Sequence, residues 1–188
     1  MRKVYFVRHA KPDFSIVDDY IRPLTEEGCK DCKKVTKFLK DKSITKVFSS
    51  PYKRAVDTVK DFAESLGLNI HIVHDFRERK INKGLWIEDF NAFAKEQWNN
   101  FDYKLPEGEC LNEVQKRNIK ALISLLEEDI DENIAIGCHG TALSTVINYF
   151  DNKFNFVEFD RIKNIMPLIV CLTFDGQDII NIEEFILQ

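Results

Sequence analysis

The stretch VYFVRHA at residues 4–10 decides how the rest of the chain is interpreted. Four apolar residues followed at once by an arginine and a histidine predict a short buried strand, which delivers two cationic side chains to its carboxyl end. The pattern recurs twice: residues 134–138 lead into His139 and Gly140, and residues 46–49 lead into Ser50 and, four residues later, Arg54. Three predicted strands therefore end in junctions that carry arginine or histidine.

Ligands of open α/β sheets bind outside the carboxyl ends of the strands, so all three junctions are expected to face one crevice. Two arginines and two histidines that converge there describe an anion site, most naturally one for phosphate. The net charge of −4 argues against a nucleic-acid partner. A mildly acidic chain with a cationic pocket suits a small anionic substrate.

The remaining strands and helices follow from hydrophobic periodicity and turn residues. Further strands are expected at 69–73, 169–174 and 179–186, and helices at 25–40 (capped by Thr25), 51–66, 87–98, 111–128 and 140–150. Strands that alternate with helices predict a three-layer α/β/α domain over residues 1–188. The closing hairpin adds at least one antiparallel strand.

Composition and cysteine spacing indicate where the protein is expected to be located and whether it is expected to bind a metal or cofactor. No apolar run approaches the ~20 residues of a membrane span, and charged residues interrupt the N-terminal apolar run, so neither a membrane partner nor a signal peptide is expected. Five cysteines fit a reducing, cytoplasmic location. Cys29 and Cys32 fall inside a predicted helix with no second pair, and Cys138 ends a strand, so we expect no metal, no cofactor and no cysteine nucleophile.

Each candidate site residue has a plainer interpretation. His9 and His139 could be core histidines bonded to backbone carbonyls, but Arg8 beside His9 would then be a buried charge without a partner. A neutral imidazole is a competent nucleophile toward phosphorus, and Arg8 would favour the neutral ring. Gly140 begins a predicted helix whose N–H groups could face an anion. Arg54 could equally be a solvated helix arginine.

Glu78 lies in the charged run 75–80, where a surface charge cluster is the better interpretation from the residues alone. Transfer of a phosphoryl group with loss of an alkoxide nevertheless requires a proton donor. Five aromatic residues between 90 and 103 could pack against the rest of a substrate or against a helix core: Phe90, Phe93, Trp98, Phe101 and Tyr103.

A set of motifs, in order over nearly the whole chain, resembles the histidine phosphatase superfamily, the phosphoglycerate mutase-like group. The motifs are Arg8-His9-Ala10, Arg22-Pro23-Leu24-Thr25-x-x-Gly28, Ser49-Ser50-Pro51-x-x-Arg54-Ala55-x-x-Thr58, Phe76-Arg77-Glu78, Pro106-Glu107-Gly108-Glu109 and His139-Gly140. The resemblance implies a mostly parallel sheet and a phosphohistidine on His9. It also implies that Arg8, Arg54 and His139 hold the phosphoryl oxygens, that Glu78 protonates the leaving group, and that no metal is needed.

Several positions depart from the family pattern. Ala10 replaces the usual glycine and would crowd a phosphate if its backbone needed positive φ. Pro12 replaces a hydroxyl residue and cannot donate a hydrogen bond, whereas Ser15, in place of the usual asparagine, still can. The spacing from Glu78 to Gly84 and Trp86 is about two residues longer than usual, which makes Glu88 the alternative acid.

The stretch from Glu78 to His139 is short for a mutase of this type, and a shorter lid admits water. We therefore expect a phosphatase of a small phosphomonoester, monomeric or homodimeric, similar to bacterial α-ribazole phosphatase-like members. Two alternatives remain. A phosphoglycerate mutase would need a bisphosphoglycerate primer. A catalytically silent phospho-ligand binding protein, with Ala10 and Pro12 as marks of a degraded site, would bind phosphate without turnover.

Overall fold

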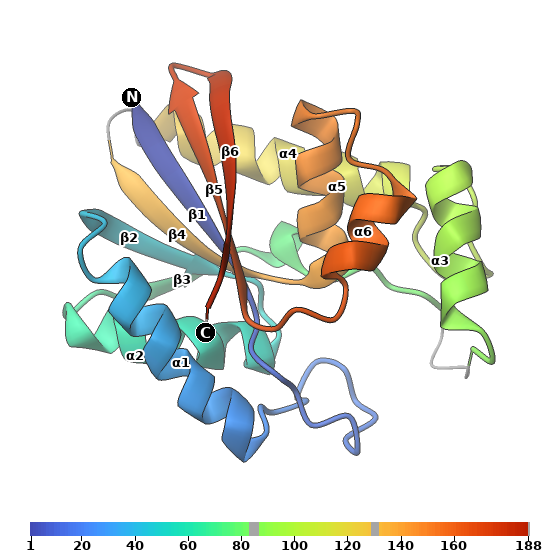
Figure 1. The fold of residues 1–188 in the computed structure, drawn as a ribbon, viewed down its shortest axis with the longest axis horizontal. Helices are drawn as coiled ribbons and strands as arrows, with labels where there is room; N and C mark the ends of the chain where they lie inside the picture. The colour runs from blue at the N-terminus through green and yellow to red at the C-terminus, as the bar shows by residue number, and fades with distance from the viewer. Residues whose placement is uncertain (83–86, 129–131, 188) are drawn as a thin grey trace.

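The strands of this computed structural model, which describes residues 1–82, 87–128 and 132–187, form one sheet in the order β3-β2-β4-β1-β5-β6 (Figure 1). β4 is parallel to its two neighbours, β1 and β2, and β2 is also parallel to β3. β5 is antiparallel to both of its neighbours, β1 and β6. The sheet is thus mostly parallel with an antiparallel edge, as predicted. The strands are β1 (Arg2–Arg8), β2 (Ile44–Ser49), β3 (Ile70–Ile72), β4 (Asn133–Cys138), β5 (Leu168–Asp175) and β6 (Asp178–Ile186).

Helices cover both faces of the sheet, which confirms the predicted α/β class (Figure 1). One face is covered by α1 and α2 and the other by α4 and α5, while α3 and α6 contact each other beyond α5. The helices are α1 (Glu26–Leu39), α2 (Lys53–Ser65), α3 (Phe90–Asn99), α4 (Leu111–Glu128), α5 (Gly140–Phe150) and α6 (Phe156–Ile162), and a short 3₁₀ helix, η1, spans His74–Phe76.

The alternation of side chains along β1 explains the two cores. Tyr5 and Val7 point to one face, where they join the apolar stripes of α1 and α2. Val4 and Phe6 point to the other face, into a larger cluster that includes Leu122 of α4. Because successive strand residues face opposite sides, a continuous apolar run such as residues 4–7 must be buried on both faces.

Two helices begin later than predicted, and one helix was not predicted. α2 begins at Lys53 rather than at Pro51, because the preceding residues stay extended: the Ser50 N–H donates to the Gly137 carbonyl, and the Ser50 hydroxyl accepts the Tyr52 N–H. α3 begins three residues later than predicted, after the Asp89 cap. α6 was not predicted, because its seven residues are too few to show a helical period.

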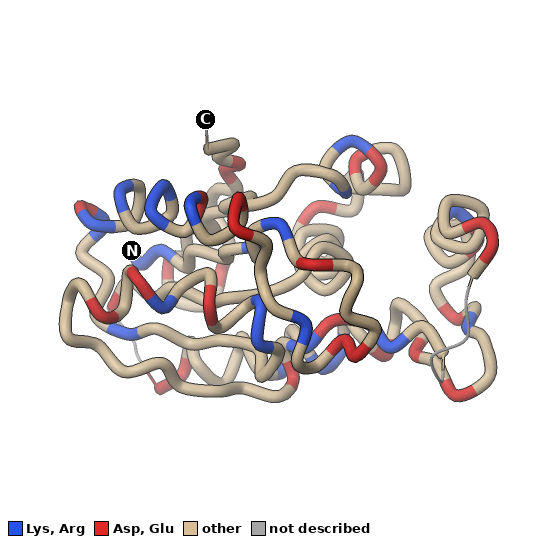
Figure 2. Tube along the Cα trace, turned by 90° about the horizontal axis from the view of Figure 1, so that it is seen from below, with Lys and Arg blue, Asp and Glu red and all other residues tan. Residues whose placement is uncertain are grey.

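Residues of both charges occur along most of the chain, as Figure 2 shows. Within the ranges that the structure describes, no helix combines the length and apolarity needed to cross a bilayer.

Candidate active site

The strand register brings the three predicted junctions together. In the parallel pairs, Arg8 is opposite Cys138 and Ser49 is opposite Gly137. The carboxyl ends of β1, β4 and β2 therefore lie side by side at one edge of the sheet, and His9 and His139 leave adjacent strands. The His9 N–H donates to the Cys138 carbonyl over 3.1 Å, which continues the ladder to the nucleophile candidate.

The two histidine rings meet edge to face, with their centroids 5.3 Å apart. His9 is 6% exposed and His139 is fully buried. Nδ1 of His9 lies 2.8 Å from the Ala10 carbonyl oxygen. A carbonyl can only accept, so the neutral ring carries its proton on Nδ1 and keeps a lone pair on Nε2. This tautomer is the one required of a nucleophile.

The His139 ring is oriented by Ser50. Nε2 of His139 lies 2.7 Å from the Ser50 hydroxyl, and this hydroxyl also accepts the Tyr52 N–H. Nδ1 of His139 is buried and has no hydrogen-bond partner among the residues that the structure describes. A buried nitrogen of this kind is usually satisfied by a ligand or water, and the oxygen of a bound anion would serve.

The electrostatic setting keeps both rings neutral. Burial lowers the pKa of His9 well below its usual range, and the guanidinium groups of Arg54 and Arg8 lower it further. Burial likewise lowers the pKa of His139, with Arg54 as the next cause. A further positive charge at this edge, beside those of Arg8 and Arg54, is therefore unfavourable until an anion enters.

These two histidines should make the protein less stable in acid. Their pKa values are lower in the folded than in the unfolded chain, so the unfolded state binds more protons as the pH falls below about 6.5. Each should remove up to about 1.4 kcal/mol of unfolding free energy per pH unit below that value. Urea unfolding between about pH 7 and pH 5 measures this slope.

The chain has two further histidines, His71 and His74, and both are exposed. Replacement of both by glutamine should leave the slope unchanged, whereas His9→Asn together with His139→Gln should flatten it. A wild-type profile that is flat over this pH range would contradict the buried, neutral state of the two rings.

Arg8 is held by the end of α6. Its Nη1 donates to the carbonyls of Ile162 (2.8 Å) and Ile165 (3.1 Å), and its Nη2 donates to that of Lys163 (2.7 Å). Its Nε is buried and has no partner among the described residues, so Nε is a donor that it can offer to an anion. A Cβ at Gly140 would lie 2.9 Å from Nη2. The glycine that follows His139 therefore makes room for Arg8.

Arg54 is buried, so the interpretation as a solvated helix arginine is wrong. Its Nη1 donates to the Asp19 carbonyl over 2.5 Å and lies 3.1 Å from the Asp19 carboxylate. That carboxylate also accepts from Nη1 of Arg22, which ties the loop 10–24 to the crevice. The sequence did not single out Asp19, because acidic residues of loops are usually solvated.

Glu78 lies at the crevice and not in a surface cluster. Its carboxylate accepts the N–H groups of Thr141 and Ala142, each over 3.0 Å, and that of Arg79 over 2.7 Å. Thr141 and Ala142 belong to the first turn of α5. These two N–H groups, which the sequence offered to an anion, are thus occupied by Glu78.

The alternative acid is less well placed. Glu88 is exposed and directly precedes the Asp89 cap of α3. The geometry therefore favours Glu78. Gly84 and Trp86 lie outside the described residues; their spacing from Glu78 is the reason that Glu88 was considered as the acid.

The positions that depart from the family pattern are accommodated. Ala10 is fully buried, packs with Leu24 and Cys32, and is not among the described non-glycine residues with positive φ, which are Ser43 and Glu107. Its methyl group therefore causes no backbone strain.

Two other positions of the same loop can be placed. Pro12 pairs with Leu24 in a short bridge. The Ser15 hydroxyl donates to the Asp13 carboxylate over 2.7 Å in an exposed turn, so its role as a phosphate ligand stays a prediction.

The other candidate groups have structural roles. Burial raises the pKa of the Cys138 thiol, which disfavours a thiolate. The Cys32 thiol donates to the Gly28 carbonyl, and within the described ranges no group of three metal-ligating side chains is found. Phe93 and Trp98 are buried in the protein, where Trp98 packs on Phe159, so these two aromatic residues are core.

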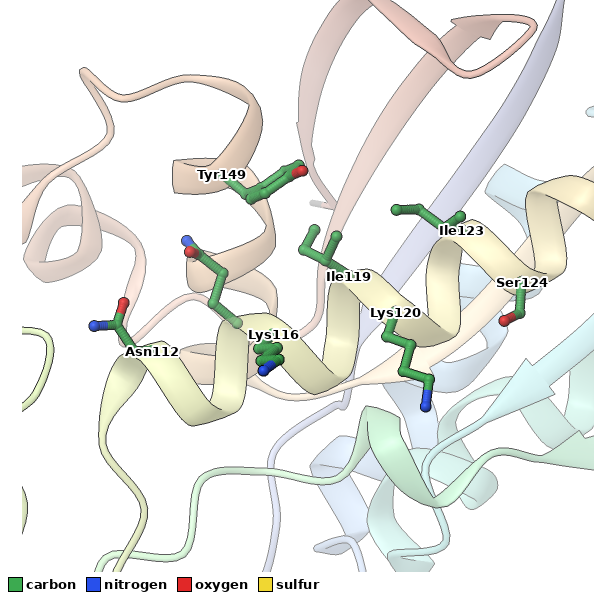
Figure 3. Close-up of a pocket in the computed structure, with 8 residues that line it drawn as sticks. Asn112, Lys116, Ile119, Lys120, Ile123, Ser124 and Tyr149 are labelled. Carbon is green, nitrogen blue, oxygen red and sulfur yellow. The ribbon is translucent and has the colours of Figure 1, made fainter.

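A groove of about 570 Å³ lies elsewhere, along α4 (Figure 3). Ile119, Ile123 and Tyr149 form its apolar part, and Lys116 and Lys120 accompany them. None of its lining residues is a predicted site residue. The cluster at the strand ends, where the charged and nucleophilic groups meet, is the candidate active site.

Fold and crevice together define an α/β protein with a histidine-centred anion site. Residues 4–180 match the family model of the histidine phosphatase superfamily, branch 1, and the chain belongs to this superfamily. The resemblance inferred from the motifs is thereby confirmed.

Individual relatives include phosphatases and mutase-like proteins. The chain is 30% identical over 161 residues to the "Probable phosphoglycerate mutase GpmB" of Yersinia pestis (strain Pestoides F), a match that covers 79% of this chain and 74% of that protein. The mycobacterial glucosyl-3-phosphoglycerate phosphatase has a similar structure, with a TM-score of 0.77, 16% identity and coverage of 98% and 97%. The structure of an Escherichia coli K-12 protein, described as a "putative alpha-ribazole-5'-P phosphatase", is also similar. Its TM-score is 0.75 at 17% identity, and the match covers 99% of this chain and 95% of that chain.

Proposed function

We propose that this protein is a metal-independent phosphomonoesterase that acts on a small phosphorylated metabolite through a phosphohistidine on His9. The observation that carries the proposal is the buried, neutral His9 with Nδ1 bonded to the Ala10 carbonyl, beside His139, Arg8 and Arg54. A neutral ring with a free Nε2 lone pair can attack phosphorus without a metal-activated water.

The proposed reaction has two steps. Nε2 of His9 attacks the phosphorus, a P–N bond forms, and the P–O bond to the alcohol breaks while Glu78 gives its proton to the leaving oxygen. Water then attacks the phosphorus, a P–O bond forms and the P–N bond to His9 breaks, while Glu78 takes a proton from that water and inorganic phosphate leaves. Arg54, Nε of Arg8 and Nδ1 of His139 would hold the phosphoryl oxygens in both steps.

Hydrolysis of p-nitrophenyl phosphate tests the proposal. We expect turnover by the wild type with EDTA present and without bisphosphoglycerate. Inhibition by EDTA that added metal reverses would contradict a metal-independent reaction. Binding of inorganic phosphate without turnover of any ester in a panel of phosphorylated metabolites would instead identify the silent binding protein.

A phosphoglycerate mutase is the second candidate, and the 30% identity to the Yersinia protein favours it. The two enzymes share the phosphohistidine and differ in what receives the phosphoryl group. Against the mutase stands the short stretch between Glu78 and His139, which we propose admits water. Interconversion of 2- and 3-phosphoglycerate that depends on a bisphosphoglycerate primer, with little phosphate released, would show the mutase.

A further inference from the structure

Arg117, near the middle of α4, uses all five of its N–H donors: three on the segment that carries Glu78 and two on Glu109. Three bonds go to main-chain carbonyls: Nη1 donates to Asp75 (2.7 Å) and Arg77 (2.8 Å), and Nη2 donates to Glu78 itself (3.2 Å). The other two go to the carboxylate of Glu109, from Nε over 2.8 Å and from Nη2 over 3.0 Å.

Glu109 completes the support on the other side of Glu78. Its carboxylate also accepts from the Arg77 side chain over 3.0 Å and from the Lys80 N–H over 2.9 Å, and its own N–H donates to the Lys80 carbonyl. Burial acts to raise the pKa of Glu109, but hydrogen bonds from Arg117 and Lys80 outweigh this and hold the pKa below its usual value. Glu109 is therefore a carboxylate at neutral pH.

The segment that these two residues hold is only partly supported by other contacts: Phe76 is buried in the core and the Arg79 side chain donates to Gln97. η1 ends at Phe76, and residues 77–80 belong to no helix or strand. Its carbonyls would otherwise have to be satisfied by water or left unpaired. The Glu78 carboxylate still reaches the first turn of α5, two to three residues beyond His139. Small errors in the position of an acid–base group are costly, because its proton must reach one reacting oxygen.

We propose that Arg117, together with Glu109, is a positioning residue for Glu78: its guanidinium group fixes the 75–80 segment so that the carboxylate lies against α5 beside the two histidines. The inference rests on the proposed function, because it assigns to Arg117 the placement of the proposed acid. Among the described residues no hydrogen bond joins Arg117 to either histidine, and its charge is the smallest of the named causes that lower the pKa of His139. Its loss should therefore reproduce the loss of the acid and leave the binding of phosphate intact.

Kinetics of Arg117→Met test this role. For an ester with a poor leaving group, such as an alkyl phosphate, kcat/KM should fall by about 100-fold, and for p-nitrophenyl phosphate by much less. The inhibition constant of inorganic phosphate should stay near that of the wild type. In the background of Glu78→Gln, the same substitution should cost little more, because both variants remove one function.

Matched variants separate position from charge and fold. Lys120→Met removes a positive charge from the same helix at an exposed position and should leave the kinetics unchanged. Arg117→Lys keeps the charge beside Glu109 but has too few donors for three carbonyls and a carboxylate, so it should resemble Arg117→Met. Rates of Arg117→Lys equal to those of the wild type would overturn the proposal, as would equal losses for good and poor leaving groups.

Amide hydrogen exchange gives a readout that needs no turnover. The N–H groups of Thr141 and Ala142 donate to Glu78, so they should exchange faster in Arg117→Met and in Arg117→Lys, as in Glu78→Ala, and not in Lys120→Met. Unchanged exchange at these two amides would overturn the positioning role. A wild type that hydrolyses no phosphate ester would refute the proposed function, whereas the exchange experiment would still decide whether Arg117 positions Glu78.

Discussion

His9→Ala should abolish turnover, with a fall in kcat of at least about 10⁴-fold, as for the loss of other enzymic nucleophiles. The reason is that no other described group combines a lone pair, burial in the crevice and the neighbouring cations. His139 is committed to Ser50 through Nε2. Cys138 is a buried thiol whose pKa is raised by burial. The measurement is the initial rate of p-nitrophenyl phosphate hydrolysis, with thermal melting to confirm that the variant is folded.

A trapping experiment makes this prediction specific for covalent catalysis. A detergent quench at high pH after brief mixing with an ester labelled in its phosphoryl group should leave label on the wild-type chain, and later acidification should release that label, because phosphohistidine is labile in acid and stable in base. His9→Ala should carry no label, and His71→Ala, an exposed histidine on β3, should behave like the wild type. Retention of label or of normal rates in His9→Ala would refute the mechanism.

Glu78→Gln should lower kcat/KM by about 10²- to 10⁴-fold for a poor leaving group, the usual contribution of a general acid. The amide cannot deliver a proton to the leaving oxygen, whereas it keeps much of the shape of the carboxylate at the first turn of α5. For p-nitrophenyl phosphate the loss in kcat/KM should be much smaller, because nitrophenolate leaves without protonation. A series of aryl and alkyl phosphates measures the dependence on leaving-group pKa.

Glu88→Gln is the matched control for this series, because Glu88 is the alternative acid and is exposed. The kcat/KM of Glu88→Gln should equal that of the wild type for every leaving group in the series. An equal loss for good and poor leaving groups in Glu78→Gln, or a steep dependence in Glu88→Gln instead, would move the acid from Glu78.

The sequence predicted those parts of the molecule whose cause is local. The apolar runs of β1 and β4 and the period of α4 are each set by neighbouring residues. Both strands lie where those runs placed them, and the predicted bounds of α4, 111–128, agree with the structure. Arg8, His9 and His139 could be found because strand ends are recognisable and parallel strands end at one edge. The burial of Arg54 could not be predicted from local sequence, because it depends on Asp19, 35 residues away.

The rest of the site depends on contacts that no local pattern records. Glu78 lies among charges that look solvated, and only the position of α5 makes it part of the crevice. Arg117 gives one faint signal: it is spaced three residues from Val114 and four from Ala121, both buried, so a charged side chain falls on the apolar side of the helix. A charge in that position needs a partner, but its partner cannot be named from the sequence.

The bonds from Arg8 to the end of α6 also bear on how the protein is made. They join residues 154 to 157 positions apart, so the first strand of the chain is completed by one of its last helices. During synthesis on a ribosome, His9 emerges before α6, and the guanidinium group beside it has no carbonyl partners until α6 has left the exit tunnel. The candidate site can therefore be assembled only after α6 has emerged, and a nascent chain that stops before α6 should carry the histidine without the carbonyls that hold Arg8.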